Sequence, residues 1–186
     1  FNINPRAIEK AITSKTKAIV PVHLFGQPAA MDEILEIAKK YNLYVIEDNA
    51  QALGAYFKNK EGKKIKTGCI GDIGTTSFFP SKNLGCYGDG GAIFTNNDEL
   101  AHLIRGIANH GMYKRYYHDV VGVNSRLDSI QAVVLNEKLK LLDTYNEKRR
   151  KSADTYTSFF KNNPKIITPK VVGDRNSHVF HQYTLR

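Results

Sequence analysis

The sequence has 186 residues, of which 41% are hydrophobic and 24% charged, so it holds enough apolar material for the core of an ordinary domain. This composition excludes wholesale disorder. No run approaches the roughly 18 to 20 apolar residues that a membrane-spanning helix needs, and no basic-then-apolar leader opens the chain, so we expect a soluble, unexported protein. Two cysteines without zinc-site spacing favour a reducing cytoplasm and predict no metal site.

The first part of the chain alternates between helical and strand-like patterns. A proline at a plausible helix start predicts a helix over residues 5–13, and the apolar run after it predicts a buried strand over residues 17–22. Asp32 is expected to cap a helix over residues 33–41, and a second apolar strand is expected over residues 43–48. This alternation is typical of an α/β protein with a mostly parallel sheet.

The pattern continues through short strands and then becomes helical. Strands are expected over residues 72–79 and 92–95, followed by a helix over residues 98–108. Apolar residues at three- and four-residue spacings predict a long helical region over residues 127–160. A final apolar run predicts a strand over residues 179–185.

Pro164 and Pro169 interrupt the chain before that last run and indicate a domain boundary. We therefore expect a large α/β domain over residues 1–125, a helical connection over residues 126–162, and the start of a small α+β domain over residues 163–186. Because the chain begins with phenylalanine and stops directly after a strand-like run, we also expect it to be a fragment.

The net charge of +9 can attract nucleic acid, anionic membranes or phosphorylated small molecules. The densest basic clusters are residues 58–66, expected to form an exposed hairpin tip, and residues 148–151, expected on the solvent face of a helix. One candidate function, outside the enzymes, is therefore a basic module that binds nucleic acid or regulates another protein. No zinc-finger spacing, aromatic ribonucleoprotein motif or low-complexity arm accompanies the charge, so we expect neither nucleic acid nor a membrane as partner.

Groups that could carry chemistry follow the expected strands. Asp48 ends a strand, at the edge where parallel sheets bind ligands, and Gln51 lies one helical turn later. Lys82 follows Ser77 in a glycine-rich stretch that lets backbone approach a ligand closely. A lysine, a carboxylate and a hydroxyl are what pyridoxal phosphate needs for covalent attachment, for its pyridine nitrogen and for its phosphate. Taken alone, Asp48 is equally open to a structural role as a cap.

Five motifs make the chain resemble a known family over essentially all its residues. They are residues 21–27 (PVHLFGQ), 46–55 (IEDNAQALGA), 77–85 (SFFPSKNLG), 88–91 (GDGG) and 122–132 (GVNSRLDSIQA). Together they resemble the DegT/DnrJ family of pyridoxal-phosphate-dependent nucleotide-sugar aminotransferases. The resemblance implies the aspartate aminotransferase fold (fold type I), of which this chain would be the central part, about half the usual length.

The resemblance also implies roles for individual residues. Lys82 matches the Schiff-base lysine, and Asp48 matches the partner of the pyridine nitrogen. Gln51 would lie against the cofactor ring and its phenolic oxygen, and Ser77 would bind the phosphate. Asn124 matches an asparagine that reaches the phosphate of the neighbouring subunit, which implies a homodimer with shared active sites.

Five further residues are candidate substrate contacts: His23, His110, Tyr113, Arg126 and His181. His23 follows a strand end and either faces the cofactor or orders its loop, and we favour the second role. His110 and Tyr113 lie where cations mix with aromatic rings, a composition suited to a nucleotide diphosphate and also common on polar surfaces. Arg126 and His181 lie in segments that the family places near the active site.

The implied reaction moves an amino group from an amino acid, usually glutamate, to a keto-sugar nucleotide, for amino-sugar and surface-polysaccharide biosynthesis. Residues 116–121 (YYHDVV) and 180–184 (FHQYT) favour the 3-amino branch. Lys82 argues against the related pyridoxamine-phosphate-dependent dehydratases, which carry histidine there. A non-catalytic family member is a further alternative. A nicotinamide-dependent sugar dehydrogenase is an alternative from another enzyme class, but the sequence lacks the glycine fingerprint that such enzymes use to bind phosphate.

Overall fold

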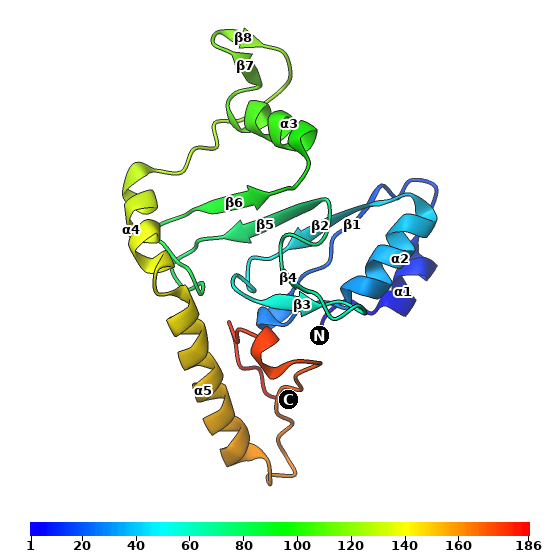
Figure 1. Ribbon diagram of the computed structural model, residues 1–186, viewed down its shortest axis with the longest axis vertical. Helices are drawn as coiled ribbons and strands as arrows, with labels where there is room; N and C mark the ends of the chain where they lie inside the picture. Colours follow the sequence, from blue (N-terminus) through cyan, green and yellow to red (C-terminus); the bar gives the residue numbers. More distant parts are fainter.

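A four-stranded sheet forms the centre of the computed structural model, which describes residues 1–186 (Figure 1). It consists of β1 (Ala18–Ile19), β2 (Tyr44–Asp48), β5 (Ile73–Ser77) and β6 (Gly91–Phe94), in the order β1-β2-β5-β6. The pairings β1–β2 and β2–β5 are parallel, whereas β6 runs antiparallel to β5. The expected mostly parallel sheet is confirmed, and the carboxyl ends of β2 and β5 lie at one edge.

Helices α1 (Pro5–Ala11) and α2 (Met31–Tyr41) pack together beside this sheet and form its largest apolar core. Met31 and Ile34 are fully buried, because the apolar positions of α2 recur at helical spacing and face the core. The expected cap at Asp32 is wrong, since α2 begins at Met31, two residues before the expected start, and no side chain caps it. Asp32 lies in the first turn, where its negative charge favours the helix N-terminus.

The basic residues 58–66 form an exposed hairpin, as expected. Its strands, β3 (Tyr56–Lys58) and β4 (Lys64–Lys66), pair antiparallel. The hydroxyl of Tyr56 donates a hydrogen bond of 2.6 Å to the carboxylate of Asp174. The hairpin is therefore tied to the C-terminal segment of the chain.

An arm formed by residues 98–124 extends away from the sheet, at the top of Figure 1. It contains α3 (Asp98–Ala108), which has the expected bounds, and a short hairpin of β7 (Met112–Lys114) and β8 (Tyr117–His118). The side chain of Asn97 caps α3 by accepting a hydrogen bond of 3.0 Å from an amide of the first turn.

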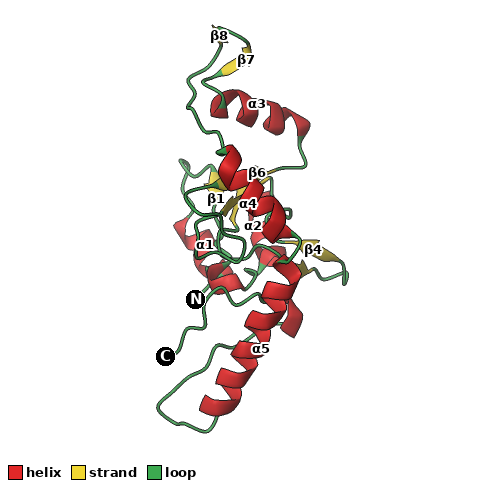
Figure 2. Ribbon diagram, turned by 90° about the vertical axis from the view of Figure 1, so that its left-hand side faces the viewer, coloured by secondary structure: helices red, strands yellow, loops and turns green.

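The helical region expected over residues 127–160 consists of two helices, α4 (Ser129–Leu139) and α5 (Leu142–Phe160). They are separated by a turn at Lys140 and Leu141, where the amide of Leu141 donates to the carbonyl of Lys138 at 3.0 Å. Figure 2 shows α5 running away from the sheet. None of the helices is both long enough and apolar enough to cross a membrane.

The strand expected over residues 179–185 is wrong. The chain remains irregular after the short helix η2 (Arg175–Ser177), and Phe180 adopts a left-handed φ of 42°, which no regular strand accommodates. Its backbone groups bond to other segments instead, and the amide of Val179 donates to the carbonyl of Gly26 at 3.0 Å. The expected division into three parts stays a prediction.

Candidate active site

Asp48 is the last residue of β2, at the carboxyl edge of the sheet. One of its carboxylate oxygens, Oδ1, accepts a hydrogen bond of 3.0 Å from the amide of Ala50, and its carbonyl accepts one of 3.0 Å from the amide of His23. The other carboxylate oxygen has no hydrogen-bond partner within the chain. Asp48 therefore holds the turn after β2 and still presents one free oxygen.

Gln51 and Ser77 each use one polar group for local structure and keep another free. The Oε1 atom of Gln51 accepts a hydrogen bond of 2.6 Å from Phe25, whose φ of 59° is left-handed, in the short helix η1 (Leu24–Gly26). The Oγ atom of Ser77 accepts one of 3.2 Å from the amide of Phe79. The amide group of Gln51 and the hydroxyl proton of Ser77 remain able to donate to a ligand.

The parallel pairing of β2 and β5 places these groups at one edge. Asp48 is in register with Thr75, so Ser77 lies two residues further along the neighbouring strand. Lys82 follows five residues after Ser77, beyond that edge. The structure therefore brings the two strand-end residues together, as the pattern of parallel strands predicts.

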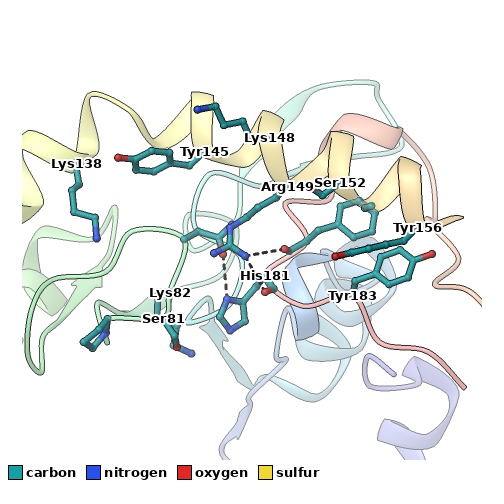
Figure 3. Close-up of a pocket in the computed structure, with 14 residues that line it drawn as sticks. Ser81, Lys82, Lys138, Tyr145, Lys148, Arg149, Ser152, Tyr156, His181 and Tyr183 are labelled. Carbon is teal, nitrogen blue, oxygen red and sulfur yellow. Dashed lines mark hydrogen bonds between the residues drawn. The ribbon is translucent and has the colours of Figure 1, made fainter. Parts of the chain in front are cut away.

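Lys82 lines an open pocket of about 700 Å³, shown in Figure 3. Its walls come from the loop around Lys82, from α4 and α5, and from the C-terminal segment that carries His181. The pocket contains no carboxylate, and its cations are Lys82, Lys138, Lys148 and Arg149. The amine of Lys82 has no hydrogen-bond or ion-pair partner within the chain. Lys82 and His181 share the pocket, whereas Asp48, Gln51 and Ser77 do not line it.

Two buried asparagines hold the loop of Lys82 against α5. The Nδ2 atom of Asn83 donates to Oδ1 of Asn146 at 2.6 Å and to the carbonyl of Val179 at 3.1 Å. The Nδ2 atom of Asn146 donates to the carbonyl of Leu53 at 3.2 Å. The sequence analysis missed both residues, although Asn146 lies four positions after a buried leucine of α5, and a polar residue in an apolar stripe was the available signal.

Arg149 is turned toward the C-terminal segment. Its Nη1 atom donates to the carbonyls of Phe180 at 3.3 Å and His181 at 3.1 Å, and burial lowers the pKa of its guanidinium. The side chain of Arg150 next to it is only 15% exposed; it pairs with Glu147 at 3.0 Å and donates to the carbonyl of Asn176 at 3.4 Å. The solvent face expected for residues 148–151 is therefore wrong for Arg149 and Arg150, because the pattern of charges did not show which side of α5 the C-terminal segment covers.

His23 is fully buried and lies outside the pocket of Lys82. Its Nδ1 atom accepts a hydrogen bond of 3.0 Å from the amide of Ala29, so Nε2 carries the proton and donates it to Oε1 of Glu47, with the two atoms 2.9 Å apart. Both ring nitrogens are engaged within the chain, which supports the role in ordering the loop.

Glu47 is the buried partner of that histidine and holds the loop after β4. Its carboxylate accepts hydrogen bonds from the amides of Gly68 at 2.7 Å, Ile70 at 2.6 Å and Gly71 at 2.7 Å. Burial acts to raise the pKa of Glu47, but the hydrogen bonds from His23 and these amides outweigh it and lower the pKa. The residue next to Asp48 is thus held as a carboxylate.

The remaining predicted site residues lie in or next to the arm, and none lines the pocket of Lys82. His110 has a left-handed φ of 61°, and Asn124 forms an isolated bridge with Asn109. Tyr113 stacks on His102 with ring centroids 4.4 Å apart, and its buried hydroxyl has no partner. Within one chain the structure therefore does not bring these residues, or the exposed Arg126, to Lys82.

His178 is a buried titratable residue in the C-terminal segment. Its ring stacks on Phe180 with centroids 3.8 Å apart, and its Nδ1 accepts a hydrogen bond of 2.9 Å from the amide of the same residue. Burial, together with the positive charge of Arg175, lowers the pKa of His178 from 6.5 to about 4. The folded protein therefore keeps this ring neutral.

This lowered pKa predicts acid sensitivity. The unfolded chain takes up the proton at a pKa of about 6.5 and the folded chain only near 4, so protonation favours unfolding between these values. The free energy of unfolding should fall by about 3 kcal/mol because of His178 as the pH is lowered from 7 to 4. Denaturant titrations at stepped pH should show a shallower loss in His178→Gln; an unchanged slope would contradict this.

The chain belongs to the DegT/DnrJ/EryC1/StrS aminotransferase family, whose model matches residues 1–186. It is 50% identical over 186 residues to a UDP-2-acetamido-2-deoxy-3-oxo-D-glucuronate aminotransferase of Pseudomonas aeruginosa, a match that covers 100% of this chain and 50% of the relative. It is 52% identical over 191 residues to a Geobacillus stearothermophilus protein named pleiotropic regulatory protein, covering 100% and 49%. The chain spans about half the length of the curated relatives it matches.

Solved structures of the family share the fold. DesV of Streptomyces venezuelae, in complex with a ketimine intermediate, matches with a TM-score of 0.91 and 42% identity, covering 100% of this chain and 48% of that one. NtdA of Bacillus subtilis, with bound cofactor PMP, matches with a TM-score of 0.86 and 36% identity, covering 99% and 41%. The fold of a pyridoxal-phosphate-dependent sugar aminotransferase is therefore confirmed for this chain.

Proposed function

We propose that this chain carries the reactive lysine of a pyridoxal-phosphate-dependent aminotransferase that moves an amino group from L-glutamate to a keto-sugar nucleotide. The observation that carries the proposal is the unpaired amine of Lys82 in a pocket lined by cations and no carboxylate. Cations that face no carboxylate suit a nucleotide diphosphate. The name of the Pseudomonas relative specifies a 3-oxo sugar, so we propose amination at C3, in the formation of amino sugars for surface polysaccharide.

The donor set of the site fits pyridoxal phosphate. Lys82 offers an amine without a competing partner in its pocket, and Asp48 offers a free carboxylate oxygen at the end of β2, outside the lining of that pocket. The free amide protons of Gln51 suit the phenolic oxygen, and the hydroxyl proton of Ser77 suits the phosphate. These side chains thus offer the covalent anchor, the ring-nitrogen partner and the phosphate donor that the cofactor requires, and a donor for its phenolic oxygen.

The chemistry then divides among these side chains. When bound, pyridoxal phosphate supplies a protonated ring that withdraws electrons from the reacting carbon. Asp48 holds the proton on the ring nitrogen, and Gln51 and Ser77 orient the ring. The amine of Lys82 removes the proton from the α-carbon of the amino acid, and in the second half-reaction it delivers a proton to the sugar carbon that receives nitrogen.

The proposed protein is a homodimer with shared active sites. Asn124 is exposed at the base of the arm and lies outside the pocket of Lys82, which suits a residue that reaches the partner's phosphate. Large apolar side chains close to it in sequence are also exposed, including Val121 at 96%, Ile130 at 73% and Val133 at 65%. An apolar surface of this kind is typical of a subunit interface.

The proposal predicts two separable half-reactions. The protein as its gene encodes it should bind pyridoxal phosphate with a visible absorption band that L-glutamate bleaches and a 3-keto-sugar nucleotide restores. A 4-keto-sugar nucleotide should restore the band at least tenfold more slowly, since a misplaced reacting atom costs about that much or more. A protein that binds no cofactor would contradict the proposal and favour a regulatory role, in keeping with the name of the Geobacillus relative.

A further inference from the structure

The side chain of Asn83 has a fixed orientation, and this orientation determines what it offers to His181. Its Nδ2 faces two oxygens, Oδ1 of Asn146 at 2.6 Å and the carbonyl of Val179 at 3.1 Å. Asn146 cannot turn its amide, because its own Nδ2 donates to the carbonyl of Leu53 at 3.2 Å. The remaining group of Asn83, Oδ1, accepts hydrogen bonds only, and it lies 3.2 Å from Nδ1 of His181.

An acceptor at that position requires the proton of the imidazole to be on Nδ1. The other ring nitrogen, Nε2, then carries a lone pair. It has no hydrogen-bond partner within the chain, and His181 lines the pocket of Lys82. Burial and the charges of Lys82 and Arg149 lower the pKa of His181 to about 4. The other titratable groups that line the pocket are lysines and tyrosines, so no carboxylate favours the imidazolium.

We propose that Nε2 of His181 is a hydrogen-bond acceptor for a hydroxyl group of the sugar, and that Asn83 and Asn146 are positioning residues that set its tautomer. This inference rests on the proposed function. The lone pair on Nε2 repels a phosphate and suits a hydroxyl group that donates a hydrogen bond. The cations of the pocket, by contrast, attract the phosphates. Figure 3 shows His181 beside Lys82, on the side of the pocket opposite α5, where it can read the substrate next to the reacting lysine.

The tautomer can be measured without cofactor or substrate. In two-dimensional ¹H–¹⁵N spectra of histidine side chains, assigned with a His181→Gln variant, His181 should show a protonated Nδ1 and a bare Nε2 from pH 8 down to about 5. Asn146→Leu removes one of the two acceptors that orient Nδ2 of Asn83 and should give a mixture of the two tautomers. A protonated Nε2, or a ring that titrates near 6.5, would overturn the proposal.

The hydroxyl contact has a kinetic test. His181→Asn keeps a donor toward Asn83 but is too short to present an acceptor to the pocket, whereas His181→Gln places an amide oxygen near the position of Nε2. His181→Asn should raise KM for the keto-sugar nucleotide about tenfold, with the glutamate half-reaction within about twofold of wild type. His181→Gln should recover part of the loss.

An unchanged KM in His181→Asn, with an unchanged melting temperature, would overturn the hydroxyl contact. Equal losses in both half-reactions would do the same, because they would indicate a general disturbance of the pocket. Failure of the proposed function is distinguishable, since wild-type protein would then lack both half-reactions while the tautomer of His181 would still be measurable.

Discussion

Replacing Lys82 by alanine should reduce turnover by a factor on the order of 10³ or more, because the variant loses both the covalent anchor of the cofactor and the base that moves the proton. Two of the three other cations that line the pocket already bind backbone carbonyls. Lys138 donates to the carbonyl of Gly85, and Arg149 is committed to two carbonyls of the C-terminal segment. Initial rates with glutamate and a 3-keto-sugar nucleotide measure the loss.

Lys151→Ala is the matched control, since it removes an exposed lysine from α5 that does not line the pocket. Its turnover should remain within about twofold of wild type, because exposed substitutions away from a site have small effects. Lys82→Ala with turnover comparable to this control would contradict the assignment of Lys82.

The largest expected loss of stability follows from Glu47→Gln. The buried carboxylate accepts four hydrogen bonds, from His23 and from three backbone amides, and an amide of the same shape would turn donors toward donors. The free energy of unfolding should fall by about 3 to 5 kcal/mol, the range found when one partner of a buried charged network is removed. Urea unfolding at pH 7 measures it.

Glu36→Gln provides the comparison, because Glu36 is an exposed carboxylate paired only with Lys60. Its loss should cost at most about 1 kcal/mol, as for other surface ion pairs. Equal destabilisation by the two substitutions would show that the network around Glu47 contributes no more than a surface pair.

Elements with local determinants in the sequence could be predicted. The helix over residues 98–108 is bounded by a capping asparagine and by apolar residues at helical spacing, and the structure reproduces it. The C-terminal segment could not be predicted in this way. Its apolar run resembles a strand, but the left-handed Phe180 and the bonds to Gly26 and Arg149 depend on segments far away in sequence.

The residues of the candidate site differ in the same way: some could be recognised from the local sequence, and others only from distant contacts. Asp48 could be singled out because it ends an apolar strand, and Lys82 because a motif of a known family surrounds it. Asn146 was not recognisable as part of the site, because its partner Asn83 lies 63 residues earlier in the chain. The tautomer proposed for His181 depends on that pair, so it could be inferred only once the packing of α5 against the loop of Lys82 was known.

Reduction with borohydride, followed by peptide mass mapping, tests the central claim most directly. Protein loaded with pyridoxal phosphate and reduced should carry one pyridoxyl group per chain, on the peptide that contains Lys82. The label should be absent when glutamate has converted the cofactor to its amine form before reduction. A pyridoxyl group on a different lysine, or no label at all, would contradict the account of this chain as the lysine-bearing part of an aminotransferase.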